Sequence, residues 1–302
     1  MHFFNSIVAH TIPFVPRALI QKISRRYIAG DSLDQAIDRI SQLNTSGFSV
    51  TIDVLGEIAT TSQGVRNTVE EYTRVLHAIS AKALIATISI KPTAFGLHFD
   101  SAACEKWIAH LAQLAGLHQT SVCIDMEDLR CTQHELDMFE RLRSRYENVS
   151  LALQAYLKRT YQDIDLLLKK QTSLRICKGI YIEDRTHLVE DAWKNRDAIN
   201  RHFLHHVKSC FTANSFVAVA THDEHLIEQI IALAKYDGIA KTAFEFQMLL
   251  GVCEPLRDRL LSAGFSMRVY LPYGKDWYGY STRRIKENPS IAGHILKALW
   301  HR

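Results

Sequence analysis

Stretches rich in valine, isoleucine and leucine recur at fairly even intervals along the chain. Eight of them have the character of buried strands, at 48–55, 84–91, 120–126, 149–156, 173–181, 215–222, 238–246 and 266–273. The segments between them place apolar residues at three- and four-residue spacing, which is typical of amphipathic helices. The clearest examples are 65–80, 102–115, 134–146 and 196–210. Near-continuous apolar strands that alternate with helices predict a parallel sheet covered on both faces.

Eight strand–helix units within about 250 residues are typical of a (β/α)8 barrel. A doubly wound open sheet is the alternative. No GxGxxG follows the first strand-like stretch, however, so a nucleotide-binding fold of that kind loses its main support. No linker rich in Pro, Gly or Ser divides the chain. We therefore expect a barrel over 48–302, with 1–47 as extra helices laid against it.

Charge and cysteine usage narrow the class of protein further. The 302 residues include 36 Lys+Arg and 32 Asp+Glu, a net charge of +4, and the basic residues are scattered. Nucleic acid is therefore not an expected partner. The six cysteines form no CxxC pair, which favours a reducing, cytoplasmic location.

The N-terminal residues bear on membrane contact. Residues 1–16 are apolar but have no basic residue ahead of the apolar part and no clear cleavage site, so a signal peptide is not expected. No segment approaches the roughly 18 to 20 apolar residues of a membrane span. Arg17, Lys22, Arg25 and Arg26 alternate with apolar residues. Such a basic amphipathic helix either touches anionic lipid or packs on its own domain, so we expect at most peripheral contact at the inner face of the membrane.

Polar side chains gather at the last positions of the strand-like stretches. They are Asp53, Glu57, Lys91, Asp125, Glu127, Asp128, Gln154, Tyr156, Arg175, Lys178, Thr221, His222, Asp223, Glu245, Gln247, Tyr270 and Tyr273. In a barrel the carboxyl ends of all strands meet on one face, which is where barrel enzymes keep their active sites. The pattern therefore predicts one convergent site.

Each of these residues also has a structural interpretation. Lys91 is equally explained as an ion-pair partner of a neighbouring acid, and Asp125 as the cap of the following helix. Arg175 and Lys178 stand three positions apart in a strand, so they point to opposite faces unless Gly179 or a bulge redirects one.

Histidines offer a further, weaker signal. His222 is explained as well by a satisfied core imidazole as by a site residue. His202, His205 and His206 have metal-ligand spacing on a helix, but they lie away from the convergent face, so no metal is expected there.

The stretch 267–288 contains an adjacent pair, Arg283 and Arg284, on a predicted helix one turn after Tyr280. Two neighbouring guanidiniums form a receptor for a carboxylate or phosphate. A solvated pair on a surface helix is the alternative. The four tyrosines and one tryptophan within 270–280 are too many aromatics for a solvated face, which favours the receptor.

Seven sequence blocks occur in an order that resembles the proline dehydrogenase family. They are ISIK (88–91), IDMED (124–128), LQAYLKR (153–159), LRICKGIY (174–181), ATHD (220–223), FEFQMLLG (244–251) and RVYLPYG with WYGYSTRR (268–284). The resemblance runs from about residue 27 to the end of the chain. It implies a distorted (β/α)8 barrel that binds FAD without a Rossmann motif, oxidises L-proline to Δ1-pyrroline-5-carboxylate and passes electrons to a membrane quinone. The length favours the monofunctional bacterial type.

The same resemblance implies a role for individual residues. Asp125 and Arg175 would be the catalytic pair. The substrate carboxylate would be held by Lys91, Arg283 and Arg284. Tyr270 and Tyr280 would form a wall for the ring, and Leu249 and Tyr181 would line the pocket. FAD would be contacted by Met126, Gln154, Arg175, Lys178, Gly179, Ile180, Thr221 and His222.

Three positions depart from the family pattern, and three other functions stay open. Ile180 stands where the family usually has a small residue, Pro92 follows Lys91, and Gly279 replaces a common proline, which puts substrate range and affinity in doubt. A hydroxyproline dehydrogenase is possible, although Tyr270 leaves less room for a ring hydroxyl. A Schiff-base aldolase would use Lys91 or Lys178 as nucleophile. A flavin-free scaffold would have no reason to keep charged residues at seven strand ends.

Overall fold

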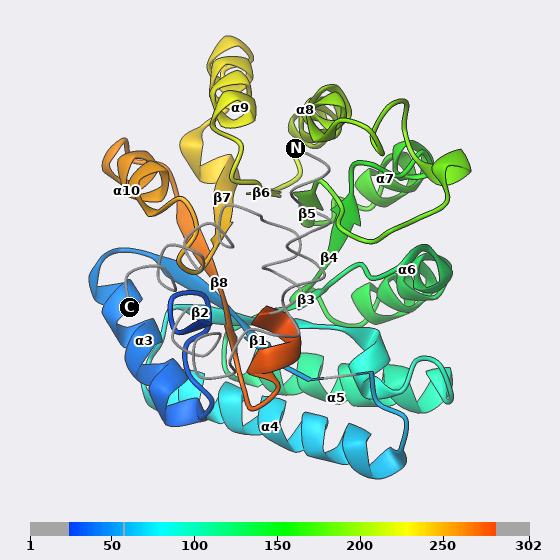
Figure 1. Cartoon of the computed structure of the whole chain (residues 1–302), viewed down its shortest axis with the longest axis vertical. Coiled ribbons are helices and arrows are strands. Elements are labelled where there is room, and N and C mark those ends of the chain that lie inside the picture. The colour runs from blue at the N-terminus through cyan, green and yellow to red at the C-terminus, as the bar shows by residue number, and fades with distance from the viewer. Residues whose placement is uncertain (1–23, 57, 282–302) are drawn as a thin grey trace, which may run out of the picture.

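The computed structural model describes residues 24–56 and 58–281. Within them, parallel strands close into a barrel in sequence order, which confirms the predicted (β/α)8 class (Figure 1). The strands are β1 (Ser49–Val54), β2 (Ala86–Ile90), β3 (Val122–Ile124), β4 (Val149–Gln154), β5 (Leu174–Cys177), β6 (Val217–Ala220), β7 (Phe244–Leu249) and β8 (Met267–Tyr273).

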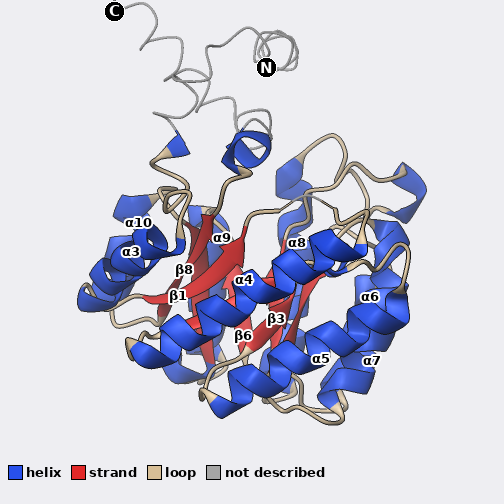
Figure 2. Ribbon diagram, turned by 90° about the horizontal axis from the view of Figure 1, so that it is seen from below, coloured by secondary structure: helices blue, strands red, loops and turns tan. Residues whose placement is uncertain are grey.

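Helices form the outer wall of the barrel, as Figure 2 shows from the side. They are α3 (Leu33–Thr45), α4 (Ser62–Ala81), α5 (Ser101–Leu117), α6 (Leu129–Arg143), α7 (Thr160–Leu168), α8 (Asn200–Thr212), α9 (Glu224–Tyr236) and α10 (Glu254–Ser262). Short 3-10 turns are η2 (Pro92–Phe95), η3 (Arg185–His187), η4 (Arg196–Ile199) and η5 (Lys241–Ala243). Side-chain caps begin several helices; Thr61 accepts a hydrogen bond from the amide of Gly64, and Asp223 accepts one from the amide of Leu226.

The wall is completed by a helix from the predicted N-terminal extension. Helix α3 precedes β1 and lies between α10 and α4 (Figure 1). It buries Ala36, Ile40 and Leu43. The helical turn that begins at Trp277, directly after β8, therefore does not occupy this place in the wall. It follows the carboxyl end of β8, where the convergent site is expected.

Strand residues alternate between the helices and the interior of the barrel. Ile52, Ile88 and Ile124 are fully buried or nearly so, whereas Asp53 is in register with Ser89, and Ser89 with Cys123. Because side chains one residue apart point to opposite faces, the apolar set packs under the helices while the polar set lines the barrel. The side chains that can bind or react therefore lie on the inner face of the strands.

The predicted position of the seventh strand was wrong. It begins at residue 244 instead of 238 and continues to residue 249, because a turn and η5 fill the earlier residues. Glu245 and Gln247 therefore lie within the strand, not at its end. The Glu245 carboxylate accepts hydrogen bonds from Gln247 Nε2 and Arg268 Nε, both at 2.7 Å. Glu245 and Gln247 are therefore buried and bonded to each other within the barrel, and they are not placed at its carboxyl end.

The three α8 histidines pack around one tyrosine. Tyr161 Oη lies 2.6 Å from His202 Nδ1, and the Tyr161 ring centroid lies 4.8 Å from that of His205 and 4.6 Å from that of His206. No group of three His, Cys, Asp or Glu side chains in the described part of the chain is placed to hold a metal ion. The spacing of these histidines is explained by packing.

His206 gives a prediction about stability. Its ring is fully buried, both ring nitrogens lack a hydrogen-bond partner, and burial together with the neighbouring His205 lowers its pKa to about 3. The unfolded state takes up a proton near pH 6.5 while the folded state does not, so stability is lost as pH falls below 6.5.

Between pH 7 and pH 5 the free energy of unfolding of the unmodified protein should therefore fall by about 2 kcal/mol more than that of His206→Leu. Urea unfolding at the two pH values measures this difference. His205→Leu changes an exposed neighbour and should retain the original loss, because it leaves His206 in place. An identical pH dependence in the unmodified protein and His206→Leu would contradict the assignment.

Candidate active site

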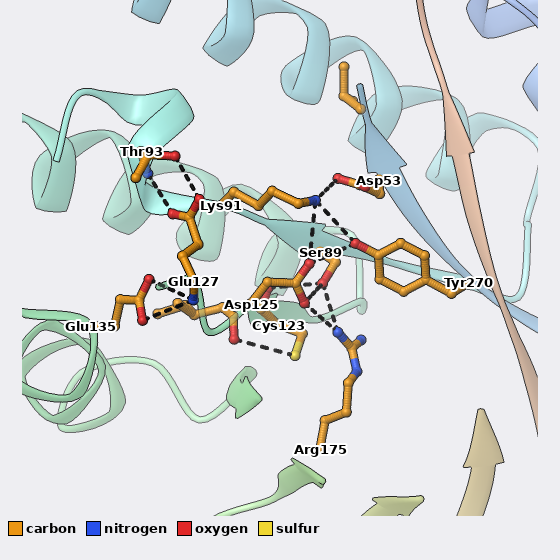
Figure 3. A network of polar contacts seen from close by, with 12 residues as sticks. Asp53, Ser89, Lys91, Thr93, Cys123, Asp125, Glu127, Glu135, Arg175 and Tyr270 are labelled. Atoms are coloured by element: carbon orange, nitrogen blue, oxygen red, sulfur yellow. Dashed lines mark hydrogen bonds and ion pairs between the residues drawn. The ribbon is translucent and has the colours of Figure 1, made fainter. Parts of the chain in front are cut away.

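A network of charged and polar side chains from the ends of five strands occupies the mouth of the barrel (Figure 3). At one side Lys91, which directly follows β2, places its Nζ 2.7 Å from Asp53 Oδ1 and 3.3 Å from Tyr270 Oη. The Lys91 side chain is 28% exposed, whereas that of Asp53 is 3% exposed. The buried Asp53 carboxylate therefore holds the Lys91 ammonium in place, while part of the Lys91 side chain stays exposed to solvent.

Asp125 stands at the centre of this network. Its Oδ1 accepts hydrogen bonds from Ser89 Oγ at 2.7 Å and from Arg175 Nη1 at 2.5 Å. Its Oδ2 accepts one from Tyr270 Oη at 2.6 Å and lies 3.6 Å from Lys91 Nζ. The carboxylate thus joins residues of β2, β5 and β8, and it fixes two cations at once.

The charges of the network are set by their mutual contacts. Burial alone would raise the pKa of Asp125, but the Arg175 guanidinium and the Lys91 ammonium outweigh it and hold this pKa below its usual value. Burial also opposes the charge on Lys91, yet Asp53 and Asp125 raise its pKa. Burial raises the pKa of Asp53 itself. Lys91 and Arg175 are therefore cations, and Asp125 is an anion, at neutral pH.

A second group of polar residues lies where β5 and β6 end. Lys178 Nζ lies 2.7 Å from Asp223 Oδ2, which also accepts a hydrogen bond from Asn200 Nδ2 at 2.8 Å. The amide of Asp223 donates to the Thr221 hydroxyl at 3.2 Å. Because β5 ends at Cys177, Lys178 lies beyond the strand, and the alternation of strand faces no longer separates it from Arg175.

Gly179 allows the chain to turn at this point. Its φ is +99°, and a Cβ would lie 2.2 Å from the Tyr156 ring, so no other residue fits without displacement. Arg196 Nη2 donates to the carbonyl oxygen of Gly179 at 2.7 Å. Ile180 follows with 40% of its surface exposed. The result is a backbone turn with two cations beside it.

Comparison with known proteins decides the family. A family model described as "Proline dehydrogenase" matches residues 36–296. The chain belongs to the proline dehydrogenase family. As a member it is an enzyme, a flavin-dependent oxidoreductase.

Individual relatives agree with this assignment. The chain is 38% identical over 275 residues to "Proline dehydrogenase 2" of Bacillus subtilis (strain 168), covering 91% of this chain and 89% of the relative. It is 30% identical over 288 residues to "Proline dehydrogenase" of Deinococcus radiodurans, covering 94% and 92%.

The fold is also found in a solved structure. The PutA protein of Bdellovibrio bacteriovorus, inactivated by N-propargylglycine, superposes with a TM-score of 0.81 at 21% identity. The match covers 89% of this chain and 33% of the PutA chain. This likeness concerns the barrel fold.

The described residues fit the flavin that this proline dehydrogenase requires. A flavin nucleotide brings phosphates and a ring edge that accepts hydrogen bonds, so its site needs cations and unpaired donors. Arg175 Nε, a hydrogen-bond donor, is buried and has no partner in the described structure. Lys178 and Arg196 supply positive charge beside the Gly179 turn. The donor set therefore suits such a cofactor.

Other predicted site residues lie along the same rim. Gln154 Nε2 donates to the carbonyl oxygen of Glu127 at 2.9 Å, and Met126 is buried one residue earlier. His222 Nε2 accepts a hydrogen bond from the amide of Leu249 at 2.9 Å, so a neutral His222 carries its proton on Nδ1. The structure thus joins a residue predicted to contact FAD to one predicted to line the substrate pocket.

Several predicted residues are not placed in this network. Tyr280 is buried in the turn that begins at Trp277. Arg283 and Arg284 lie outside the described residues, as do Glu57 and the first part of the basic segment, 17–23. Their assigned roles remain predictions from the sequence.

Some contributors were not singled out by sequence reasoning. Ser89 binds both members of the Asp125–Arg175 pair, and Asn200 and Arg196 lie beside the Gly179 turn. The signal for Ser89 was available, since it stands two residues before Lys91 and so shares its face of the strand. Asn200 and Arg196 come from a crossover without a strand period, where no such signal exists.

Proposed function

We propose that this chain oxidises L-proline to Δ1-pyrroline-5-carboxylate with FAD bound at the carboxyl end of the barrel, and that a membrane quinone receives the electrons. Proline dehydrogenase activity follows from the family and the relatives. The observation that carries the site assignment is the Asp125 network, which holds the partly exposed Lys91 and the buried Arg175 as cations at the barrel mouth. FAD itself, the quinone and the roles of single residues are part of the proposal.

Substrate binding is assigned to Lys91 with Arg283 and Arg284. An ammonium has three donors, and the contacts with Asp53 and Tyr270 use two of them, so one remains for a substrate carboxylate. The two guanidiniums would bind the same carboxylate in a bidentate manner. Tyr270 cannot rotate freely, since its hydroxyl is bound to Asp125, and its ring would form a fixed wall for the substrate ring.

Hydride removal is assigned to the side of the network that contains Arg175. When bound, FAD supplies the acceptor, N5 of its ring, for a hydride from carbon 5 of proline. The buried Arg175 guanidinium has an unpaired Nε–H, and a donor of this kind stabilises negative charge that develops near it. Asp125 keeps the guanidinium in place. The proline nitrogen assists only when it is unprotonated, so activity should rise with pH.

The charge state of Lys91 argues against the aldolase alternative. A Schiff-base nucleophile must be a neutral amine, whereas Asp53 and Asp125 raise the pKa of Lys91 above its usual value despite burial. Lys178 is likewise engaged with Asp223 at 2.7 Å. Both lysines form ion pairs with carboxylates, which does not favour the neutral amine that a Schiff-base nucleophile needs.

The electron acceptor and the membrane remain part of the proposal. No helix in the described part of the chain is long and apolar enough to cross a membrane. A quinone in the bilayer would have to be reached by peripheral contact, for which the basic segment 17–26 is the proposed element. Flotation with anionic liposomes, with and without residues 1–30, tests this contact; equal flotation of both forms would refute it.

A steady-state assay tests the reaction itself. The purified protein should reduce a soluble quinone analogue when L-proline is supplied. With trans-4-hydroxy-L-proline we expect kcat/KM to be at least about tenfold lower, because the fixed Tyr270 ring excludes a further hydroxyl. Higher kcat/KM with the hydroxylated substrate would assign the chain to hydroxyproline oxidation.

The Asp53–Lys91 pair gives a pH prediction. Asp53 raises the pKa of Lys91, so Asp53→Asn should let Lys91 lose its proton at a lower pH. The ratio of the proline KM of the variant to that of the unmodified enzyme should rise from near one at pH 7 to about ten in the alkaline range. KM measured at several pH values checks this. A ratio that does not depend on pH would separate Asp53 from substrate binding.

A further inference from the structure

Glu127 connects the ends of three strands at the barrel mouth, and neither the sequence blocks nor the proposed mechanism supplies a role for it. It lies three residues after the end of β3 and is 7% exposed. Its carboxylate and its amide are both engaged, as Figure 3 shows, and its carbonyl oxygen also accepts a hydrogen bond.

The Glu127 carboxylate binds the segment that follows Lys91. Its Oε2 accepts a hydrogen bond from the amide of Thr93 at 2.9 Å, and its Oε1 accepts one from the Thr93 hydroxyl at 2.7 Å. Thr93 is the second residue of η2, which begins directly after Lys91. Because only Pro92 separates them, and its ring fixes φ, the position of Thr93 determines where the Lys91 side chain starts.

The main chain of Glu127 is held from two other elements. Its amide lies 3.2 Å and 3.3 Å from the two carboxylate oxygens of Glu135, a fully buried residue of α6. Its carbonyl oxygen accepts a hydrogen bond from Gln154, the last residue of β4, at 2.9 Å. Asp125 is two residues earlier on the same short segment. The contacts of Glu127 therefore connect the ends of β2, β3 and β4 to the wall helix α6.

We propose that Glu127 is a positioning residue for proline oxidation, which sets the relative position of Lys91 and Asp125 by binding Thr93 on one side and the α6 wall on the other. This inference rests on the proposed function. Glu127 acts through geometry: what matters is the pair of hydrogen bonds to Thr93, not a negative charge near the substrate.

Three variants separate geometry from charge. In Glu127→Gln the amide oxygen can accept from the Thr93 amide while the NH2 group donates to the Thr93 hydroxyl, so both contacts persist without the charge. Glu127→Ala removes both contacts. Thr93→Val removes only the hydroxyl and keeps the backbone contact. Asp163→Ala is the control for general loss of stability, because it deletes a buried carboxylate of α7 that pairs with Arg159.

The measurements are the proline KM and kcat, the Kd of tetrahydrofuran-2-carboxylate, in which oxygen replaces the ring nitrogen, and the flavin content of each variant. We expect Glu127→Ala to raise KM and this Kd at least about tenfold and to lower kcat about tenfold. Thr93→Val should raise KM a few-fold. Glu127→Gln should keep the KM of the unmodified enzyme, and its KM should therefore be lower than that of Thr93→Val. Asp163→Ala should lower the melting temperature without changing KM.

Two outcomes overturn the inference while leaving the proposed function intact: normal KM, Kd and kcat in Glu127→Ala, or a loss in Glu127→Gln as large as that in Glu127→Ala. If Glu127→Ala does not fold, the comparison of Thr93→Val with Glu127→Gln decides, since equal KM values in those two variants would refute a geometric role. An unmodified protein that contains flavin but does not oxidise proline would overturn the proposed function, and this inference with it.

Discussion

Asp125→Asn should lower kcat with proline by about a thousandfold. Asparagine has nearly the same shape but no charge, so it leaves Arg175 and Lys91 without the anion that both of them contact. Loss of one preorganised electrostatic partner in an active site typically lowers kcat by about a hundred- to a thousandfold, which corresponds to about 3 to 4 kcal/mol of activation free energy. Steady-state kinetics with a soluble quinone analogue measures the change.

The flavin content of Asp125→Asn distinguishes a chemical defect from a folding defect. Full flavin content with a low kcat supports the assigned role. Asp128→Asn is a matched control, because Asp128 lies in the same loop but forms its ion pair with the exposed Arg130. It should keep kcat within about threefold of the unmodified value. A kcat for Asp125→Asn as high as that of this control would remove Asp125 from the catalytic pair.

Arg283→Met and Arg284→Met should each raise the proline KM by about two orders of magnitude. Methionine keeps much of the apolar length but removes the guanidinium, and the loss of one member of a bidentate clamp typically costs a few kcal/mol. Both positions lie outside the described residues, so this prediction depends on the sequence pattern and the resemblance. KM determined with L-proline, at concentrations extended to match the expected increase, tests it.

The controls for the arginine variants are a conservative and a remote substitution. Arg284→Lys keeps a charge but loses the planar fork, so its KM should fall between those of the unmodified enzyme and Arg284→Met. Arg201 lies on α8 and forms an exposed ion pair with Glu190, so Arg201→Met removes an exposed guanidinium and should leave KM unchanged. An unchanged KM in both Arg283→Met and Arg284→Met would eliminate the clamp.

The barrel could be predicted because each strand has a clear apolar outer face and each helix has a helical period. The apolar pattern failed where it carries no boundary information. The residues before β7 are apolar enough for a strand, yet they form a turn and η5, and this misplaced Glu245 and Gln247. Residues 238–243 are exposed or only partly buried in the structure, so the apolar residues there did not indicate a buried strand.

The site could be predicted in part because strand ends in a barrel converge whatever the loops do. That argument places Lys91, Asp125 and Arg175 on one face, where the structure joins them. It does not show which side chains bond to which. The two contacts of Ser89 and the engagement of Glu127 with Thr93 depend on distances of a few ångströms across the barrel, and no sequence period encodes those distances.

The most direct test of the central claim, that this barrel mouth oxidises proline on a bound flavin, is the visible absorbance of the purified protein before and after anaerobic addition of L-proline. The account predicts a yellow protein whose flavin absorbance bleaches with L-proline and returns when a quinone analogue is added. A colourless protein that FAD does not reconstitute, or a flavin spectrum that L-proline leaves unchanged, would contradict it.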